Sequence, residues 1–395
     1  MSRHPLAVLA PLVLLAAAAP CSTVPAVPAV PAVSAVPAAA AVPAAPAVDA
    51  RAYILVDYHT GTVLAAKEAV ARMEPASLTK LMTAYLVFQE LAAGRLKLDE
   101  SVMVSEKAWH SEGSRTFLEP GKAVPAQILI LGMIIQSGND ASIALAERVA
   151  GTEEKFAQLM NAEAARLGMV ATHFDNSTGL PSPGHYTTAR DMSLLATAMI
   201  RDFPQYYRWY SQPDFEYHGI RQPNRNGLLG RDPSVDGLKT GHTDSAGFCL
   251  VTSALRDGMR LVSVVLGSGS MKARENASAA LLNYGFSFYD TRLIARAGAR
   301  LAAVQVWKAR SSPVDVGLNR DLYVTVPREE SEAIKSALDV QQRLIAPLSA
   351  GSAVGRLRVF AGGQAVATAV LHPLQGIDAG PWWRRLIDGV RLWFA

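Results

Sequence analysis

Ser77-Leu78-Thr79-Lys80 opens an apolar run whose spacing predicts a helix over residues 78–91. Residues three apart on a helix lie one turn apart on the same side. A lysine amine placed there can take the proton of a serine hydroxyl if burial or a second cation lowers its pKa, because a free lysine is protonated at neutral pH. Leu81 and Met82 offer the burial, and Lys239 is the expected second cation. Taken alone, the pattern is far more typical of an N-cap serine followed by a solvated lysine.

Two further polar sets follow in the chain. Ser137-Gly138-Asn139 comes after an apolar helix predicted over residues 126–136, and Lys239-Thr240-Gly241 lies in a predicted strand. A hydroxyl at the first set can pass a proton to a leaving amine, and its amide can hold a substrate backbone and the lysine in register, although simple helix capping would use the same residue types. The second set offers a charge and a hydroxyl to a terminal carboxylate. A glycine on an edge strand lets an extended peptide lie alongside. In this order, the three sets predict one active site with Ser77 as nucleophile.

The region 49–290 is predicted to be one α/β (α+β) domain, with strands at both of its sequence ends and helices between them. Such an order indicates an antiparallel sheet assembled from distant segments, with a helical cluster on its face. Asp257-Gly258 is a hairpin signal between two of these strands. The expected strands are residues 52–57, 62–66, 247–255 and 259–266, and the expected helices are residues 78–91, 126–136, 140–150, 153–167, 189–202 and 272–284.

The region 291–379 has a different sequence pattern, with short segments in which apolar and polar residues alternate. This pattern predicts a small all-β sandwich domain without catalytic residues. Its expected strands are residues 301–307, 322–327, 356–361 and 364–371, the last two joined by Gly362-Gly363.

The tail, residues 380–395, is predicted to form an amphipathic helix. Tryptophan and aliphatic side chains share one face, and arginines occupy the other, which suits a helix lying in the headgroup plane of an anionic membrane leaflet. The alternative is a terminal helix docked on its own protein, which would explain the apolar face but not the arginines. The apolar face consists of Trp382, Trp383, Leu386, Ile387, Val390, Trp393 and Phe394.

The N-terminus reads as an export signal over residues 1–21, because Arg3 and His4 precede a short apolar run. Cys21 raises the alternative of a lipoprotein, which Pro20 disfavours because a small residue is wanted there. Residues 22–48, nearly all alanine, valine and proline, are expected to form an extended linker from which no core can be built. Together these features predict an exported protein at the periplasmic face of the inner membrane.

Composition excludes several other classes. The net charge of the 395 residues is +4 and no dense basic block occurs, so no nucleic-acid partner is expected. Two cysteines cannot form a disulfide scaffold, and eight scattered histidines lack ligand spacing, so neither a metal nor another cofactor is expected.

Beyond the three sets, the chain from about Arg51 onward resembles the low-molecular-mass penicillin-binding proteins of the D-alanyl-D-alanine carboxypeptidase type, peptidase family S11. A small β domain and an amphipathic C-terminal anchor are also features of that family. Four stretches carry the resemblance: Pro75-Ala76-Ser77-Leu78-Thr79-Lys80, Gln136-Ser137-Gly138-Asn139-Asp140-Ala141, Asn224-Arg225-Asn226-Gly227-Leu228-Leu229 and Asp236-Gly237-Leu238-Lys239-Thr240-Gly241-His242-Thr243.

The resemblance implies a serine-type hydrolase that removes the terminal D-alanine from peptidoglycan stem peptides through an acyl-enzyme on Ser77. Lys80 would be the general base and Ser137 would move the proton to the leaving amine. β-Lactams, which mimic the D-Ala-D-Ala terminus, would acylate the same serine. Further roles implied are carboxylate recognition by Lys239, Thr240 and Arg274, a weaker contribution of the same sort from Arg225, and an oxyanion hole from the backbone N–H groups of Ser77 and His242. A reading of His242 as a catalytic base is disfavoured, because its place after Thr-Gly suits a backbone donor.

Two alternatives remain open at this point. A serine β-lactamase of the same fold would need a carboxylate that activates the deacylating water, and Glu153-Glu154 lies at a helix start without the loop expected for it. A non-catalytic peptidoglycan-binding envelope protein would show the same tail and β domain, but it would not need Ser77, Lys80 and Lys239.

Overall fold

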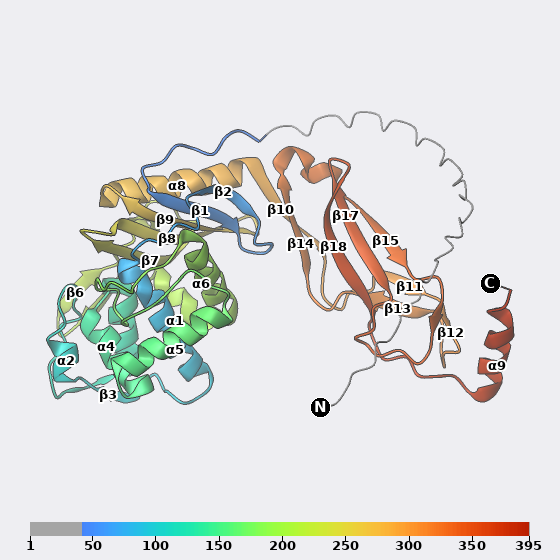
Figure 1. The fold of residues 1–395 in the computed structure, drawn as a ribbon, viewed down its shortest axis with the longest axis horizontal. Coiled ribbons are helices and arrows are strands. Elements are labelled where there is room, and N and C mark those ends of the chain that lie inside the picture. Colours follow the sequence, from blue (N-terminus) through green and yellow to red (C-terminus); the bar gives the residue numbers. More distant parts are fainter. Residues whose placement is uncertain (1–41, 395) are drawn as a thin grey trace, which may run out of the picture. The chain divides into compact units, whose positions relative to one another are not determined.

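The structure, a computed structural model, describes residues 42–394. Within that range, segments from both ends of the first region form an antiparallel sheet in the order β2-β1-β9-β8-β7 (Figure 1). β1 pairs with β9 from Ala52 opposite Leu266 to Asp57 opposite Leu261, so the predicted assembly from distant segments is confirmed. The strands are β1 (Ala52–Asp57), β2 (Val63–Lys67), β7 (Val235–Thr243), β8 (Gly247–Arg256) and β9 (Met259–Ser268).

Helices cover both faces of this sheet. Alternate residues of β1 point to opposite faces, so Ile54 belongs to the core shared with the helical cluster, and Leu55 belongs to the core shared with α8. Figure 1 shows α8 running along one side of the sheet and the other helices on the opposite side. These helices are α1 (Lys80–Ala92), α3 (Ala126–Leu131), α4 (Asn139–Ala150), α5 (Glu153–Arg166), α6 (Ala189–Asp202) and α8 (Met271–Phe288).

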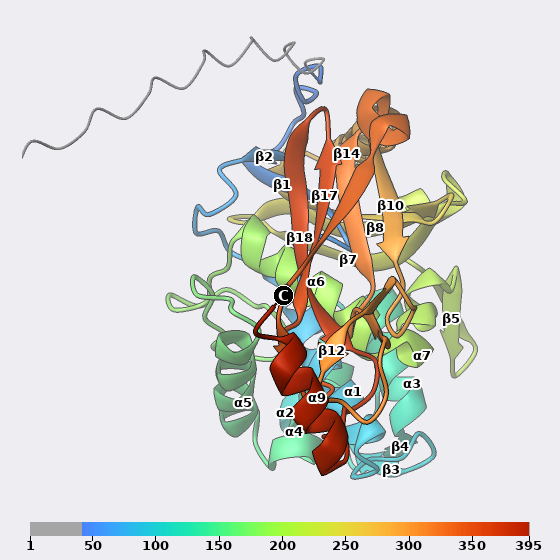
Figure 2. The ribbon, with the colours of Figure 1, turned by 90° about the vertical axis from the view of Figure 1, so that its right-hand side faces the viewer.

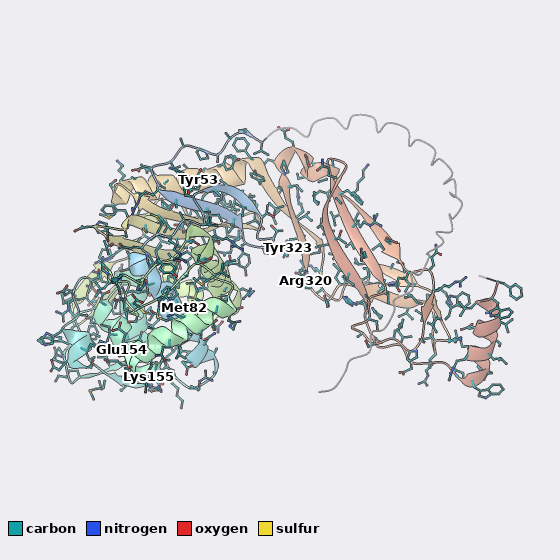
Figure 3. The ribbon with its side chains drawn as sticks, in the orientation of Figure 1. Tyr53, Met82, Glu154, Lys155, Arg320 and Tyr323 are labelled. Atoms are coloured by element: carbon teal, nitrogen blue, oxygen red, sulfur yellow. The ribbon has the colours of Figure 1, made fainter. Side chains whose placement is uncertain are left out.

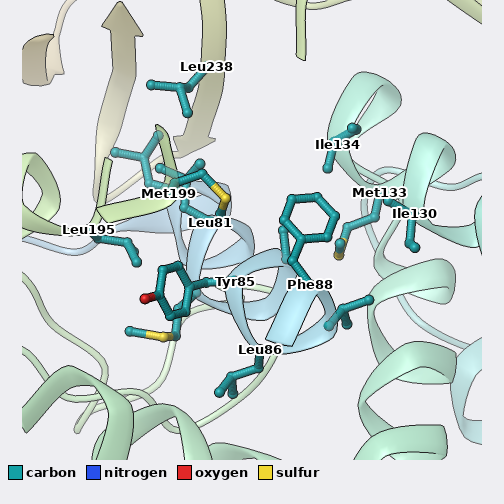
Figure 4. Close-up of a cluster of buried hydrophobic side chains, with 14 of the residues drawn as sticks. Leu81, Tyr85, Leu86, Phe88, Ile130, Met133, Ile134, Leu195, Met199 and Leu238 are labelled. Atoms are coloured by element: carbon teal, nitrogen blue, oxygen red, sulfur yellow. The ribbon is translucent and has the colours of Figure 1, made fainter. Parts of the chain in front are cut away.

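Helix α1 lies in the middle of the helical cluster, which fixes the position of its first residue, Lys80. Figure 4 shows Leu81, Tyr85 and Phe88 of α1 surrounded by apolar side chains from other elements, and Figure 3 shows Met82 inside the same cluster. All four side chains are buried. Truncating a buried phenylalanine typically costs about 3–5 kcal/mol, so this packing holds the helix firmly. The surrounding residues labelled in Figure 4 include Ile130, Met133, Ile134, Leu195, Met199 and Leu238.

Two helices differ from their predicted form at the ends that matter for the site. The helix expected from residue 78 starts as a 3-10 turn, η1 (Ala76–Thr79), before α1 begins. The helix expected over residues 126–136 ends in a π-helical turn, η2 (Gly132–Gln136), and Ser137 then adopts a left-handed conformation with φ of 71°. Apolar spacing reports the buried face of such a run, but it does not report which hydrogen-bond pattern closes its last turn.

Several short elements were absent from the sequence prediction. Each is only three or four residues long, which is too short to show a hydrophobic period. They are β3 (Ser101–Met103), α2 (Glu106–Trp109), β4 (Ala123–Pro125), α7 (Pro204–Tyr207), η3 (Arg208–Ser211), β5 (Asp214–Tyr217), β6 (Ile220–Pro223) and η4 (Gly227–Gly230).

The described end of the Ala/Val/Pro segment is not a free spacer. Val42, Ala45 and Val48 pack against the core that contains α8, and the Tyr284 hydroxyl donates a hydrogen bond to the Pro43 carbonyl at 2.9 Å. The prediction that residues 22–48 serve only as a linker is therefore wrong for residues 42–48, because an extended chain can lie along a helix without needing a helix of its own. The predicted signal at residues 1–21, Cys21 and the rest of the linker lie outside the described residues.

The second region is all-β, as predicted. Its main sheet has the order β11-β13-β18-β17-β15, and Figure 2 shows β17 and β18 side by side as long antiparallel strands. The strand expected over residues 301–307 is interrupted at Gln305. The strands are β10 (Tyr289–Ala295), β11 (Ala302–Val304), β12 (Val306–Trp307), β13 (Val314–Gly317), β14 (Leu322–Pro327), β15 (Lys335–Val340), β16 (Leu344–Ile345), β17 (Gly355–Ala361) and β18 (Gln364–Pro373), with a 3-10 turn η5 (Arg328–Ala333).

The chain ends in α9 (Trp382–Arg391), the amphipathic helix expected from the sequence. Its Asp388 carboxylate accepts a hydrogen bond from the Lys308 backbone N–H at 2.7 Å, and the Arg384 guanidinium donates to the Arg310 carbonyl at 3.0 Å. The polar side of α9 thus holds the helix to the β region, while its apolar side chains are exposed. Among residues 42–394, none of the helices has the length and apolar character needed to cross a bilayer.

Candidate active site

The nucleophile candidate lies on a turn rather than on a regular helix. Ser77 is in η1, immediately after Ala76, whose φ of 46° is unfavourable for a residue with a Cβ. Lys80 is the first residue of α1, and its Nζ lies 3.1 Å from Ser77 Oγ. The predicted pairing of the serine with the lysine is therefore present in the structure.

The Lys80 amine is surrounded by three oxygen atoms. Its Nζ contacts Asn139 Oδ1 at 2.6 Å, the Thr178 carbonyl oxygen at 2.6 Å and Ser77 Oγ at 3.1 Å. Asn139 Nδ2 donates to the Glu112 carbonyl, which turns Oδ1 toward the lysine. When the amine is neutral, the first two partners, which are pure acceptors, can take both of its N–H bonds. The lone pair that remains is available to accept the hydroxyl proton of Ser77.

Burial makes this neutral state accessible. The Lys80 side chain is fully buried, and this desolvation lowers its pKa to about 7. Arg225 lowers the Lys80 pKa further, whereas Asp140 and Glu153 raise it. Lys239, the second cation expected near this amine, does interact with Lys80, and burial together with nearby cations, Lys80 first among them, holds the pKa of Lys239 well below the ordinary lysine value.

Ser137 and Asn139 approach the same point from the next segment. The π-helical turn and the left-handed Ser137 direct this segment to Lys80, and α4 begins at Asn139 without a side-chain cap. Capping therefore does not explain Asn139. Ser137 Oγ is buried and has no hydrogen-bond partner within residues 42–394, although the residue lines the cavity beside Ser77. An unpartnered buried hydroxyl beside a cavity is a group available to a ligand.

Gly138 has a packing role in this segment. A Cβ there would come within 2.1 Å of Thr116 Oγ1, so a glycine is needed to leave room for the loop that contains Thr116. The carboxylate of Asp140 then accepts the backbone N–H groups of Thr116 and Leu118 at 2.8 Å and 3.2 Å, which fixes the loop beside the site.

Strand β7 forms the opposite wall. Thr240, Gly241 and His242 line the cavity, whereas the Lys239 side chain is buried, with its Nζ 3.0 Å from the Thr240 carbonyl oxygen. A Cβ at Gly241 would lie 3.2 Å from the backbone nitrogen of Ser77. Gly241 therefore serves a purpose that the sequence did not reveal, since it lets β7 approach the nucleophile turn as well as a ligand.

The His242 ring is engaged elsewhere. It stacks on Phe248 with ring centroids 4.0 Å apart. The hydrogen-bond partners of Ser77 Oγ within the described chain include Lys80 but not His242. This arrangement agrees with the view that His242 is not the base.

The two arginines expected near the site also line the cavity, whose volume is about 840 Å³. Arg274 is buried, and its guanidinium donates to the Gly241 carbonyl at 3.1 Å, which ties α8 to β7. Its Nε is buried without a partner in the described chain. Arg225 is more exposed, and its Nε lies 3.4 Å from Gln136 Oε1. The cavity is thus bordered by basic groups, which favours an anionic ligand.

Sequence reasoning missed several contributors to the site, among them Thr178 and Glu275. Thr178 acts through its backbone carbonyl, which any residue type could supply, so no sequence signal exists for it. Glu275 lines the cavity beside Arg274 and forms an ion pair with Arg231 at 3.3 Å. Its position next to Arg274 on one predicted helix was the available signal. Glu153, the carboxylate considered for a β-lactamase, instead accepts the N–H and hydroxyl of Ser177 at 3.0 Å and 2.7 Å.

Comparison with known proteins places this geometry in a family. A family model described as D-alanyl-D-alanine carboxypeptidase matches residues 39–270, which is more than half of the chain. The chain belongs to the D-alanyl-D-alanine carboxypeptidase family, S11. This family is a class of serine peptidases, so the chain is assigned to the hydrolases. A second model, described as the C-terminal domain of penicillin-binding protein 5, matches residues 289–378.

Individual members of the family are similar over most of the chain. The D-alanyl-D-alanine carboxypeptidase DacA of Escherichia coli strain K12 is 41% identical over 354 residues, covering 88% of each chain. The crystal structure of penicillin-binding protein 5 from Haemophilus influenzae superposes with a TM-score of 0.80 at 36% identity, covering 84% of this chain and 98% of that one. Penicillin-binding protein D2 from Listeria monocytogenes, in an ampicillin-bound form, gives a TM-score of 0.57 at 31% identity, covering 61% of this chain and 98% of that one. The predicted family, fold class and enzyme class are confirmed.

Proposed function

We propose that Ser77 is the nucleophile of this D-alanyl-D-alanine carboxypeptidase and that neutral Lys80 is its general base. Ser77 Oγ attacks the carbonyl between the two terminal D-alanines while its proton passes to Lys80 Nζ. The C–N bond then breaks, the proton reaches the leaving amine through Ser137, and D-alanine departs. Water, activated by the same amine, releases the acyl group from Ser77. The observation that carries this proposal is the position of the Lys80 amine, which lies 2.6 Å from each of two pure acceptors and 3.1 Å from Ser77 Oγ.

The wall of β7 and α8 is proposed to recognise the carboxylate of the terminal D-alanine. Thr240 offers a hydroxyl, Arg274 offers positive charge, Arg225 adds to the attractive field, and Lys239 offers an amine that a carboxylate can charge. A carboxylate beside Lys239 favours its charged form, so we infer that substrate binding brings a proton to this lysine. The backbone N–H groups of Ser77 and His242 are the proposed oxyanion hole, supported by the close approach of β7 to the nucleophile turn.

Mass spectrometry after penicillin treatment tests the nucleophile directly. One penicilloyl adduct on the peptide that contains Ser77 is expected, because a β-lactam offers the same acyl carbon as the D-Ala-D-Ala terminus. An adduct on any other residue would contradict the assignment of Ser77. Turnover of penicillin in the same sample separates a carboxypeptidase from the β-lactamase alternative. We expect slow release of the adduct, because Glu153 is occupied by Ser177 and Glu275 is paired with Arg231.

The C-terminal helix is proposed to hold the enzyme at an anionic membrane surface, at the periplasmic face of the inner membrane after export. In a helix docked by its apolar face these side chains would be buried, whereas Trp382, Leu386 and Trp393 are 76%, 65% and 90% exposed. The contacts made by Asp388 and Arg384 leave the apolar face free for lipid.

Leu386→Glu is expected to weaken binding to vesicles of phosphatidylglycerol and phosphatidylethanolamine by about 10-fold or more, because burial of one leucine contributes about 1.5–3 kcal/mol. Co-sedimentation of the full chain measures this effect. Val366→Glu, which introduces the same charge at an exposed position of β18, is the matched control and should bind like the wild type. Equal binding of Leu386→Glu and the wild type would contradict the proposed membrane role of α9.

A further inference from the structure

A loop formed by residues 175–187 lies against the turn that carries Ser77. It supplies the Thr178 carbonyl to Lys80 Nζ and the Ser177 carbonyl to Thr83 Oγ1, both at 2.6 Å. The loop is itself ordered by Asn176, whose side-chain oxygen accepts the N–H groups of Thr178 and Gly179 at 3.1 Å and 2.7 Å. The proposed general base is thus held by a segment far from the three sequence sets.

One side chain of this loop reaches the nucleophile turn. The His185 ring is buried, and its Nε2 lies 2.8 Å from Thr79 Oγ1. Its Nδ1 lies 3.3 Å from the backbone nitrogen of Asp175. A backbone N–H can only donate, so Nδ1 is the acceptor and Nε2 carries the hydrogen. The ring therefore donates to Thr79, the residue between the nucleophile and Lys80 on the turn.

This turn needs external support. Ala76 has a φ of 46°, and η1 has no side-chain cap at its start. Such strained backbone persists when the surrounding structure holds it. Gly179 packs so closely that a Cβ there would lie 1.8 Å from the Ala76 carbonyl oxygen and 2.8 Å from Thr79 Oγ1. His185 and Gly179 therefore hold the two ends of the strained turn from the same loop.

We propose that His185 is a positioning residue for acylation, since its hydrogen bond to Thr79 keeps Ser77 Oγ aligned with the Lys80 amine. The inference rests on the proposed roles of Ser77 and Lys80. It assigns a function to a buried polar side chain that does not line the cavity and that the reaction scheme above does not use.

The charge state of the ring fits this role. Burial lowers the pKa of His185 to about 4, so the ring is neutral at physiological pH and keeps its single-donor pattern. The charged groups that act on it are Asp175, which raises its pKa, and His173 and Lys80, which lower it. A neutral ring also adds no positive charge beside the amine of Lys80.

Acylation by penicillin, resolved into the binding constant and the rate constant of the chemical step, tests the proposal. His185→Leu is expected to lower the chemical rate constant by about 10-fold to 100-fold, because misplacing the reacting groups by about 1 Å can have an effect of this size. The binding constant should be nearly unchanged, because the cavity wall is intact. His185→Gln retains an N–H donor and should recover most of the rate.

Thr79→Val provides a second route to the same contact. It removes the acceptor and should lower the chemical rate constant to a similar extent as His185→Leu. The double variant should then be no slower than either single variant, since both remove one interaction. If His185→Leu fails to fold, Thr79→Val answers the question alone. His173→Gln, an exposed histidine close to the same loop, is the matched control and should react like the wild type.

Two results would overturn the inference. One is a folded His185→Leu variant that is acylated at the wild-type rate. The other is a His185→Gln variant as slow as His185→Leu, which would indicate a packing role for the ring. Either result would leave Ser77 and Lys80 untouched if the wild type carries its adduct on Ser77. A wild type without an adduct on Ser77 would overturn the proposed function and this inference together.

Discussion

Ser77→Ala is expected to abolish release of D-alanine from a peptide ending in D-Ala-D-Ala. Among the three hydrogen-bond partners of Lys80 Nζ, only the Ser77 hydroxyl can give up a proton. We therefore expect no other group in the described cavity to replace Ser77 as the nucleophile. Removing the nucleophile of a serine peptidase lowers kcat by on the order of 10⁶-fold, and a loss of that size is below detection in ordinary assays. Release of free D-alanine, measured with a coupled oxidase, gives the readout.

The same variant separates an enzyme from a binding protein. Ser77→Ala should still bind the peptide, because the carboxylate wall on β7 and α8 is unchanged, but it should carry no penicilloyl adduct. Ser211→Ala, at an exposed serine bonded to the Arg208 carbonyl, is the control and should retain full activity. A Ser77→Ala protein that released D-alanine at the normal rate would favour a non-catalytic role for the S-x-x-K set.

Lys80→Met is expected to lower the rate of Ser77 acylation by about 10²-fold to 10⁴-fold, the usual contribution of a general base. Methionine is apolar and of similar length, so it fits the buried position without a charge to desolvate. Deacylation should fall as well, since the same amine is proposed to activate water. Stopped-flow acylation by a chromogenic cephalosporin measures the first step, and decay of the adduct measures the second.

Lys155→Met is the matched control for this experiment. Lys155, labelled in Figure 3, is an exposed residue in the first turn of α5 and does not line the cavity. Its replacement should change neither step. Wild-type acylation rates in a folded Lys80→Met protein would show that another group takes the proton of Ser77.

Much of this site could be predicted from the sequence because its chemistry resides in side chains. The predicted set of Ser77, Lys80, Ser137 and Asn139 converges in the structure. The Lys239 side chain is buried next to Thr240 and Gly241, which line the cavity. Side-chain identity and order along the chain carry that information. The main elements were readable for a related reason, since α6 has the predicted bounds 189–202 and its buried face repeats with the helical period.

The remaining features depend on the three-dimensional arrangement. The Thr178 carbonyl has no sequence signal, and the lowering of the Lys80 pKa by Arg225 depends on the proximity of two segments that are distant in the sequence. The left-handed Ser137 and the strained Ala76 are set by the contacts around them rather than by local preference. Residues 42–48 were assigned to a linker because closely spaced prolines prevent a helix, yet their apolar side chains pack against the core that contains α8.

Acylation requires Lys80 to be uncharged when it meets Ser77, and the pH dependence of the acylation rate constant reports this charge state. Its pKa is lowered from the ordinary lysine value to about 7, so the neutral fraction rises as the pH increases through 7. The second-order rate constant for acylation by penicillin, which reports on groups of the free enzyme, should therefore increase about tenfold per pH unit below this midpoint and level off above it. A rate constant that stays flat across neutral pH, or that rises only near the pKa of an exposed lysine, would contradict the account.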